Sequence, residues 1–252
     1  MPEAPDDSLK ADITVVADVV VQKYGEHKPL YRQQQAFDRI GIPLTRQTLC
    51  DWVGWCSDQL EPVVRAMADH IRLQPLIQSD ETPVRMQLRN GQMQTARLWA
   101  YGLPWAEVVF DFRTDRSQHG PAEFLAGAQA QHIQADGGSS YTPVLSRLSM
   151  SHIACMAHIR RKIYEAREDA PAPSKQLLAA IQGLYRIEAQ AKVDKIGLPA
   201  LLELRNKESR PIFENVGKLL KSFEKMRPPK TPFGKAISYA QNQWKAMERY
   251  LG

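Results

Sequence analysis

The sequence predicts an α/β protein in which helices flank a mixed β-sheet, with a helical segment before the sheet and an all-helical region after it. Three observations support this class. Residues 74–170 hold short runs rich in aromatic and β-branched residues, separated by helical stretches. Residues 1–73 and 171–252 carry apolar residues near helical spacing. The 252 residues are 43% hydrophobic and 24% charged, which is typical of a globular chain of one large domain or two modest ones.

The segment before the sheet is expected to form helices. Gly41 is suited to end the second of them, and Thr45 is suited to cap the third. Pro62 is expected to interrupt the third, because proline cannot donate the backbone hydrogen bond that a helix interior needs. Two helices joined by a tight turn have the outline of a helix-turn-helix, although a plain helical pair that packs on the next domain has the same outline. The expected helices are 9–23, 29–41 and 46–73.

The central segment alternates between the two patterns in a definite order. Three strands with short links come first, and two further strands are each reached through a helix, which predicts a mixed sheet with helices packed on it. The expected strands are 75–80, 96–103, 106–114, 131–136 and 151–158. The expected helices are 121–128 and 159–169, with a turn or short helix at 139–148. Beyond them, helices are expected at 174–193, 198–226 and 232–251, the last two separated by Pro228 and Pro229.

The charge is unevenly distributed. Residues 1–150 hold 14 Lys and Arg against 18 Asp and Glu, whereas residues 151–252 hold 19 against 10, within a net charge of +5. A basic half joined to a mildly acidic half suggests a polyanionic partner such as nucleic acid, and a solvated helical surface is the alternative. The sequence has no signal-peptide pattern and no apolar run of membrane-spanning length, and three cysteines do not suggest a disulfide framework. We therefore expect a cytoplasmic protein with no membrane partner.

Two aspartates each follow a short apolar run. Asp80 ends the first strand candidate, in "IQSD", and Asp136 ends the fourth, in "IQAD". Carboxylates at the ends of neighbouring strands can converge, and they repel each other unless a cation neutralises them. Mg²⁺ prefers one or two carboxylates together with phosphate oxygens and water. The pattern thus points to a metal site, and the alternative is two turn-forming aspartates.

The chain resembles the transposases of the Insertion Sequence 66 family over nearly its whole length. "SDETPV" at 79–84 is similar to the first catalytic aspartate motif of the family, and "QADGGSSY" at 134–141 is similar to the second. "CMAHIRRKIYE" at 155–165 resembles its Cys-x-x-His-x-Arg-Arg signature. Further segments resemble the helices before the catalytic core and the helical insertion after it. Several motifs in the same order make the resemblance specific.

The resemblance implies a DDE-type catalytic core with a ribonuclease-H-like fold. Asp80 and Asp136 would be catalytic and would bind Mg²⁺ or Mn²⁺, with two ions in the intact family site. The implied activity is DNA transposition by metal-dependent phosphoryl transfer on DNA ends. The implied partners are the element ends and target DNA, accessory proteins of the element, and further copies of the chain in an oligomer on DNA.

The sequence also departs from the family pattern. Family members continue into an Asp-Asn-Asn…Glu-Arg segment that supplies the third catalytic acid, and this sequence ends at Gly252 without that motif. We do not assign Glu248 that role, because its helix precedes the catalytic glutamate in the family. The expectation is a C-terminally truncated transposase that is inactive alone. The alternatives are a catalytically inactive DNA-binding remnant and a general metal-dependent nuclease of the same fold.

Further residues are candidates through the resemblance or the charge pattern. Cys155 and His158 form a lone Cys-x-x-His, which does not make a zinc site without a second ligand pair, and they either brace the site or are simply packed. Basic residues directly after them fit phosphate contacts or a solvated basic face. Tryptophans are expected to pack rather than to stack on bases. The basic residues are Arg160, Arg161 and Lys162, the tryptophans are Trp99, Trp105 and Trp244, and further candidate site neighbours are Asp115, Arg116 and His119.

Overall fold

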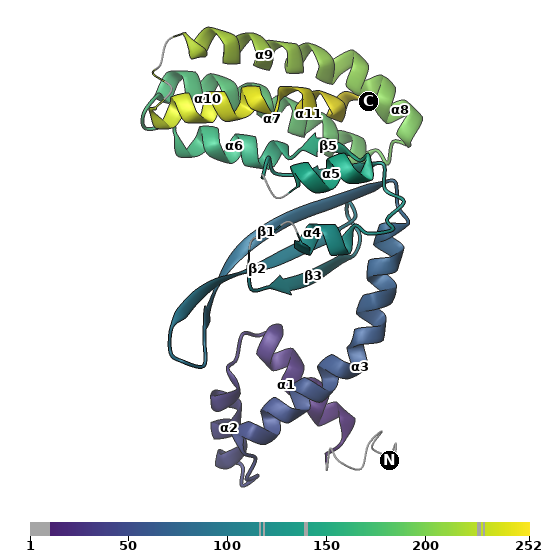
Figure 1. The fold of residues 1–252 in the computed structure, drawn as a ribbon, viewed down its shortest axis with the longest axis vertical. Helices are drawn as coiled ribbons and strands as arrows, with labels where there is room; N and C mark the ends of the chain where they lie inside the picture. Colours follow the sequence, from purple (N-terminus) through teal and green to yellow (C-terminus); the bar gives the residue numbers. More distant parts are fainter. Residues whose placement is uncertain (1–10, 116, 118, 139–140, 226–227, 229) are drawn as a thin grey trace. The chain divides into compact units, whose positions relative to one another are not determined.

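The computed structural model describes residues 11–252 except 116, 118, 139–140, 226–227 and 229 (Figure 1). The chain divides into two compact units, one through Asp69 and the other from His70 to Gly252. Arg116 and Pro229, which the sequence singled out, lie outside the described residues. Among the described residues, no helix combines the length and the apolar character needed to cross a bilayer.

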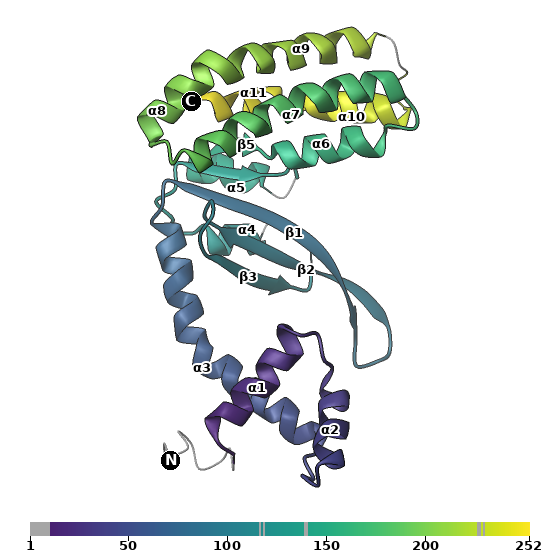
Figure 2. The same ribbon diagram turned by 180° about the vertical axis from the view of Figure 1, so that it is seen from behind.

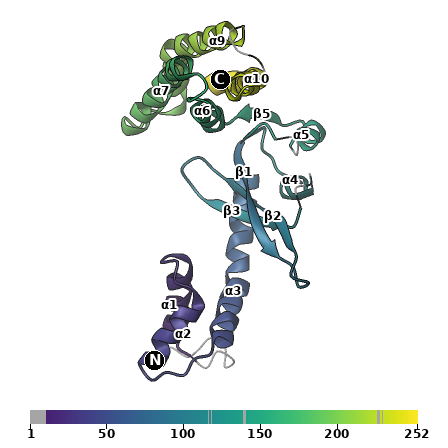
Figure 3. The ribbon, with the colours of Figure 1, turned by 90° about the vertical axis from the view of Figure 1, so that its left-hand side faces the viewer.

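The first unit consists of helices around a small apolar core, with α1 and α2 beside the N-terminal part of α3 (Figure 3). The Thr45 hydroxyl accepts a hydrogen bond from the backbone N–H of Thr48 at 3.1 Å, as expected for a cap. The predicted break at Pro62 is wrong, because α3 continues through it. Proline removes one helix hydrogen bond, and the intact turns on both sides of this long helix hold it together. The helices are α1 (Ile13–Tyr24), α2 (Leu30–Arg39) and α3 (Arg46–Arg72).

A five-stranded mixed sheet forms the centre of the second unit. The strand order is β3-β2-β1-β4-β5, in which β1 pairs antiparallel with β2 and parallel with β4. This arrangement confirms the predicted mixed sheet flanked by helices and the predicted order of strands and helices. The strands are β1 (Leu76–Gln87), β2 (Met93–Gly102), β3 (Val108–Arg113), β4 (His132–Ala135) and β5 (Ser151–Ala154), and the helices among them are α4 (His119–Phe124), α5 (Thr142–Leu148) and α6 (Met156–Glu165).

Two strand ends differ from the prediction. β1 does not end at Asp80 but runs on to Gln87, because its pairing with β2 continues after its pairing with β4 has stopped. β5 ends at Ala154, and the next residue, Cys155, caps α6 at its N-terminus. His158 therefore lies on a helix and not on the strand that the sequence suggested.

Helices α4 and α5 cover one face of the sheet. The rings of Tyr101 on β2 and Phe124 on α4 stack with centroids 3.7 Å apart, and Trp99 meets Tyr141 edge to face at 5.6 Å. The hydroxyls of Ser79 and Tyr141 are hydrogen bonded at 2.7 Å. Side chains alternate along a strand, and the odd-numbered residues of β1 and β2 point toward α4 and α5. The even-numbered residues of these two strands therefore point to the opposite face of the sheet.

The remaining helices pack around a shared apolar core, with α7 between α6 and α9 (Figures 1 and 2). Two of the three expected helices are divided. A π-helical turn separates α8 from α9 within the expected helix 198–226, and Gln243 separates α10 from α11 within the expected helix 232–251. The elements are α7 (Pro171–Val193), α8 (Leu198–Leu204), the π turn (Arg205–Ser209), α9 (Arg210–Glu224), α10 (Pro232–Asn242), α11 (Trp244–Glu248) and a final 3₁₀ turn (Arg249–Leu251).

Candidate functional site

Asp80 lies in β1 two residues after its last pair with β4, and Asp136 directly follows β4. Gln78 on β1 is paired with Gln134 on β4, and the side-chain amide of Gln78 donates a hydrogen bond to the side-chain oxygen of Gln134 at 2.6 Å. These glutamines therefore lie on one face of the sheet. Asp80 and Asp136 each follow two residues later, and the side-chain alternation of β1 places Asp80 on that same face. Asp136 lies directly beyond the end of β4.

His158 approaches this pair from the first turn of α6. Its Nε2 lies 3.7 Å from Oδ1 of Asp80, while the Asp80 side chain remains about half exposed, at 54%. The backbone N–H of Cys155 donates to the carbonyl of Ala135 at 2.9 Å, which brings the start of α6 beside the end of β4. The fold thus brings a side chain that can carry a positive charge next to Asp80, although the two residues lie far apart in the sequence.

Asp136 is held in a tight turn whose next residue, Gly137, contacts Tyr239 of α10 and Gln243 after it. Its Oδ1 accepts the backbone N–H of Gly138 at 2.9 Å, and the N–H of Gly137 donates to the Tyr239 hydroxyl at 3.2 Å. The amide of Gln243 lies so close to Gly137 that a side chain there would collide with it. A cavity of about 240 Å³ opens beside these residues, next to Asp136 and Tyr141.

Both nearby tyrosines are held in their neutral form. Burial raises the pKa of Tyr141 and of Tyr239, and the negative charge of Asp136 raises both further. Their hydroxyls are therefore hydrogen-bonding groups at neutral pH and not phenolate bases. Together with Gln243 they are polar groups of the site that sequence reasoning missed. The resemblance could have directed attention to the helix that carries two of them, but only the fold brings it to Asp136.

The turn after β3 is not brought to the carboxylate pair. β3 is separated from β1 by β2, and Asp115 lies beyond the end of β3, where its carboxylate accepts the backbone N–H of Ser117 at 2.8 Å. His119 begins α4, the helix on the face of the sheet opposite to Asp80. These residues therefore do not surround the same point as Asp80 and Asp136.

The three consecutive basic residues of α6 point in different directions. The Lys162 ammonium lies 4.8 Å from the ring centre of Tyr239, while Arg160 lines a groove against α7. Arg161 is exposed. A helix places successive residues about 100° apart, so the three cannot contact one phosphate together.

The tryptophans divide between packing and exposure. Trp99 is fully buried, and Trp244 stacks on Phe213 with ring centroids 4.4 Å apart, so both pack as expected. The expectation is wrong for Trp105, whose exposed fraction is 86%. It lies in the turn between β2 and β3 at a φ of 62°, and the Lys192 ammonium sits 3.4 Å from its ring centre.

Glu248 does not lie at the carboxylate end of the sheet. At the start of α11, Gln243 is next to Gly137, whereas just past its end Arg249 donates a hydrogen bond to the carbonyl of His152 near the start of β5. α11 therefore runs away from Asp136 along β5, and Glu248 lies toward the far end. This placement agrees with leaving Glu248 without a catalytic role.

The donor set fits one hard divalent cation. Two carboxylates on one face match what Mg²⁺ takes from proteins when phosphate oxygens and water complete its shell. Within the described part of the chain, no cluster of three or more His, Cys, Asp or Glu side chains has the geometry of a metal site. The described residues thus offer two candidate carboxylates and form no closed metal cage.

Comparisons with known proteins place the chain in a family. Three curated relatives from Sinorhizobium fredii (strain NBRC 101917 / NGR234), the uncharacterized proteins y4hP, y4qI and y4jD, are 24%, 26% and 26% identical over 94%, 94% and 97% of this chain. The chain spans about half the length of these relatives, 47%, 47% and 50%.

Among solved structures, the catalytic domain of Mos1 mariner transposase aligns with 76% of this chain and 90% of its own, at 11% identity and a TM-score of 0.24, which is too low to support a conclusion. The family described as "Transposase IS66 family" matches residues 9–252, nearly the whole sequence. The chain therefore belongs to the IS66 family of transposases.

Proposed function

We propose that this chain acts in DNA transposition, with Asp80 and Asp136 holding a divalent cation at the point where DNA strands are cut and joined. Residues 74–170 would form the catalytic core, 1–73 a helical segment that binds DNA or packs beside it, and 171–252 a helical insertion region. DNA, as element ends and target, would be the substrate. Family membership supports the general role.

One observation carries the assignment to these residues. The hydrogen bond between Gln78 and Gln134 fixes the register of β1 on β4, and the same offset of positions relates Asp80 to Asp136. Packing alone gives no reason to put two carboxylates side by side on one face, since their charges repel. A shared cation removes that repulsion and explains the pairing.

The residues around the pair have separate tasks in this proposal. When bound, the metal would activate the attacking oxygen of water or of a DNA end and stabilise the leaving oxygen of an in-line phosphoryl displacement. Asp80 and Asp136 would hold the ion. His158 is placed to donate a hydrogen bond to a phosphate oxygen beside Asp80. Tyr239 and Gln243 fix the turn that carries Asp136.

Metal binding tests the proposal without requiring turnover. Isothermal titration with Mn²⁺ should give a site in the 252-residue protein that weakens at least tenfold in Asp80→Asn and in Asp136→Asn, because each variant removes one of two charged ligands. The control is Asp58→Asn, the same chemical change at an exposed position of α3. Fe²⁺ with ascorbate and peroxide should cleave the backbone near residues 80 and 136.

Two results would count against the proposal. One is equal Mn²⁺ affinity in the wild type and both site variants. The other is iron-dependent backbone cleavage at positions elsewhere in the chain, since cleavage occurs only near the bound ion.

A further inference from the structure

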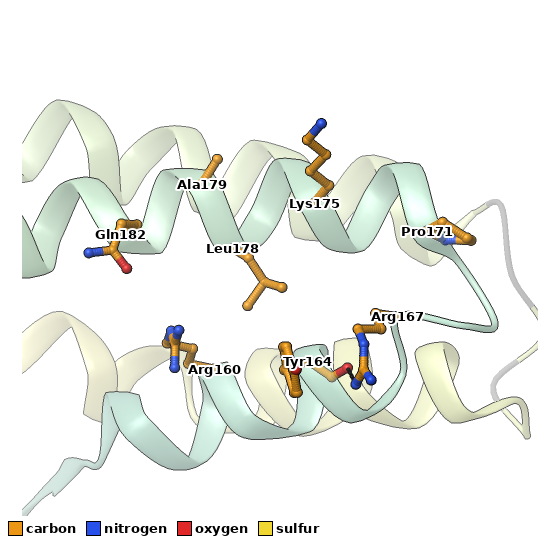
Figure 4. Close-up of a pocket in the computed structure, with 8 residues that line it drawn as sticks. All are labelled: Arg160, Tyr164, Arg167, Pro171, Lys175, Leu178, Ala179 and Gln182. Atoms are coloured by element: carbon orange, nitrogen blue, oxygen red, sulfur yellow. Dashed lines mark hydrogen bonds between the residues drawn. The ribbon is translucent and has the colours of Figure 1, made fainter.

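A groove runs between α6 and α7 on the second unit. Figure 4 shows Leu178 of α7 pointing toward α6 and Lys175 pointing away from it. The groove is lined by one stripe of each helix. Their spacing of three, four or seven residues is what places side chains on one side of a helix. The groove encloses about 480 Å³. The lining residues are Arg160, Tyr164 and Arg167 from α6 and its end, and Pro171, Lys175, Leu178, Ala179 and Gln182 from α7.

The lining is basic and contains no acid. Arg160, Arg167 and Lys175 carry three positive charges, and no Asp or Glu is among the lining residues. Arg167 has a weak ion pair with the exposed Glu168 at 3.8 Å. Within the described residues, neither Arg160 nor Lys175 has a carboxylate at ion-pair distance. The groove therefore attracts an anionic ligand that brings its own negative charge.

The floor of the groove is apolar and aromatic. Leu178 and Ala179 lie along it, and the Tyr164 ring is 49% exposed at its edge. The Arg167 guanidinium lies over one face of that ring, 4.1 Å from its centre, and itself presents a flat surface. Flat aromatic and guanidinium surfaces of this kind stack with nucleobases. A duplex keeps its bases inside and presents mainly sugar and phosphate, so it would not use this floor.

The groove leads toward the carboxylate pair. Tyr185 follows Gln182 on the same side of α7, and it interacts electrostatically with both Arg160 and Cys155. Cys155 caps the end of α6 that lies beside β4 and Asp136. From the far end of the groove, the stripe on α6 spans seven residues, about 10 Å. The groove thus points along α6 toward the helix end at Cys155.

We propose that this groove binds an unpaired DNA strand, with its phosphates on Arg160, Arg167 and Lys175 and a base on Tyr164. The proposal deepens the proposed function, on which it rests, by assigning a path for single-stranded DNA beside the site of strand cleavage. A groove that accepts bases as well as phosphates suits unpaired nucleotides.

The test uses fluorescence anisotropy with the 252-residue protein and a mixed-sequence single strand of about 12 nucleotides. Tyr164→Ala should weaken binding about tenfold, whereas Tyr164→Phe, which keeps the ring, should stay within about twofold. Arg160→Ala/Lys175→Ala should lower the dependence of log affinity on log salt by about 1.4, since each single-strand phosphate contact contributes about 0.7. The wild type should bind the matching duplex more weakly than the single strand, and Tyr164→Ala should lose most of this preference.

Matched controls separate this proposal from general charge effects. Lys218→Ala/Lys221→Ala removes two exposed charges from α9, on the other side of α7, and should leave the salt dependence nearly unchanged. Equal losses in the two double variants would overturn the proposal. Unchanged single-strand affinity in Tyr164→Ala would overturn it as well, because the groove would then bind backbone only.

The two proposals can fail separately. Mn²⁺ affinity of the groove variants should equal that of the wild type. If Mn²⁺ binding proves independent of Asp80 and Asp136 while the groove variants behave as described, the metal assignment fails and the groove stands. If Mn²⁺ binding behaves as proposed and the groove variants match their control, the groove assignment fails alone.

Discussion

Repulsion between Asp80 and Asp136 should make the metal-free protein less stable than a variant that lacks one of the two charges. Asp80 and Asp136 are related by the same sequence offset as the paired Gln78 and Gln134, whose strands lie about 4.8 Å apart. Two unit charges about 5 Å apart repel by roughly 0.8 kcal/mol in water and by roughly 3 kcal/mol at the effective dielectric of a protein surface. Because the Asp80 side chain is 54% exposed, the lower part of this range applies, about 1 kcal/mol.

Asp136→Asn is the cleaner perturbation of the two. Asparagine keeps the oxygen that accepts the Gly138 N–H, so the turn should persist, and His158 contacts Asp80 rather than Asp136. Without metal, the variant should be more stable by about 1 kcal/mol. For a folded unit of this size that raises Tm by about 2–4 °C.

Metal should reverse the order of stability. At about 100 times the dissociation constant, Mn²⁺ adds about 2.7 kcal/mol to the wild type and little to Asp136→Asn. Thermal unfolding followed by circular dichroism, with and without Mn²⁺, measures both effects, and Asp58→Asn should show the wild-type response. The reasoning is refuted if Asp136→Asn gains no stability without metal, or if Mn²⁺ stabilises it as much as the wild type.

Other substitutions test the packing and the chemistry. Glu188→Ala should cost about 2 kcal/mol in urea unfolding, because it leaves the partly buried Arg205 without its bidentate partner at 2.8 and 2.9 Å; a loss below about 0.5 kcal/mol would contradict this. Burial alone would raise the pKa of Glu188, but hydrogen bonds from Arg205 and a tyrosine outweigh burial and lower this pKa. The Glu188 carboxylate should therefore contribute its full stabilisation above about pH 5 and lose it as the pH falls through the lowered pKa. Glu188→Gln should lack this pH dependence of the free energy of unfolding. Gly217→Ala should destabilise by about 1 kcal/mol, because a Cβ would meet the Trp244 ring at 2.8 Å, whereas Gly54→Ala, with open space, should stabilise by a similar amount in calorimetry. The 252-residue polypeptide should bind Mn²⁺ without nicking duplex DNA, because its described residues form no cluster of three metal-binding side chains, and Mn²⁺-dependent nicking that either carboxylate variant abolishes would contradict this.

Local chemistry made much of the fold predictable. Thr45 caps α3 because a hydroxyl at a helix start accepts backbone N–H groups, and the alternating strand and helix patterns gave the element order correctly. Pairing beyond the local window was not predictable. β1 passes through Asp80 because β2, about twenty residues further along, supplies hydrogen bonds to it, and no local pattern reports that.

The candidate site was predictable in part for the same reason. The two aspartates stood out because each follows an apolar run that forms a strand. Gln243 and Tyr239 carry no such signal, and they reach Asp136 only through the packing of α10 and α11. Trp105 was misjudged because a large ring is usually buried, and a turn with positive φ places it outside.

The short strand β4 sets how much length variation this chain can tolerate. With only four residues, from His132 to Ala135, it has no spare register: a deletion or insertion of one residue would turn Asp136 to the opposite face of the sheet. The buried Ile133 and the bonded Gln134 both resist such a slip. The hairpin loops at 88–92 and 103–107 carry no such restriction. Homologous chains should therefore vary in length at these loops and keep the segment 132–136 free of gaps.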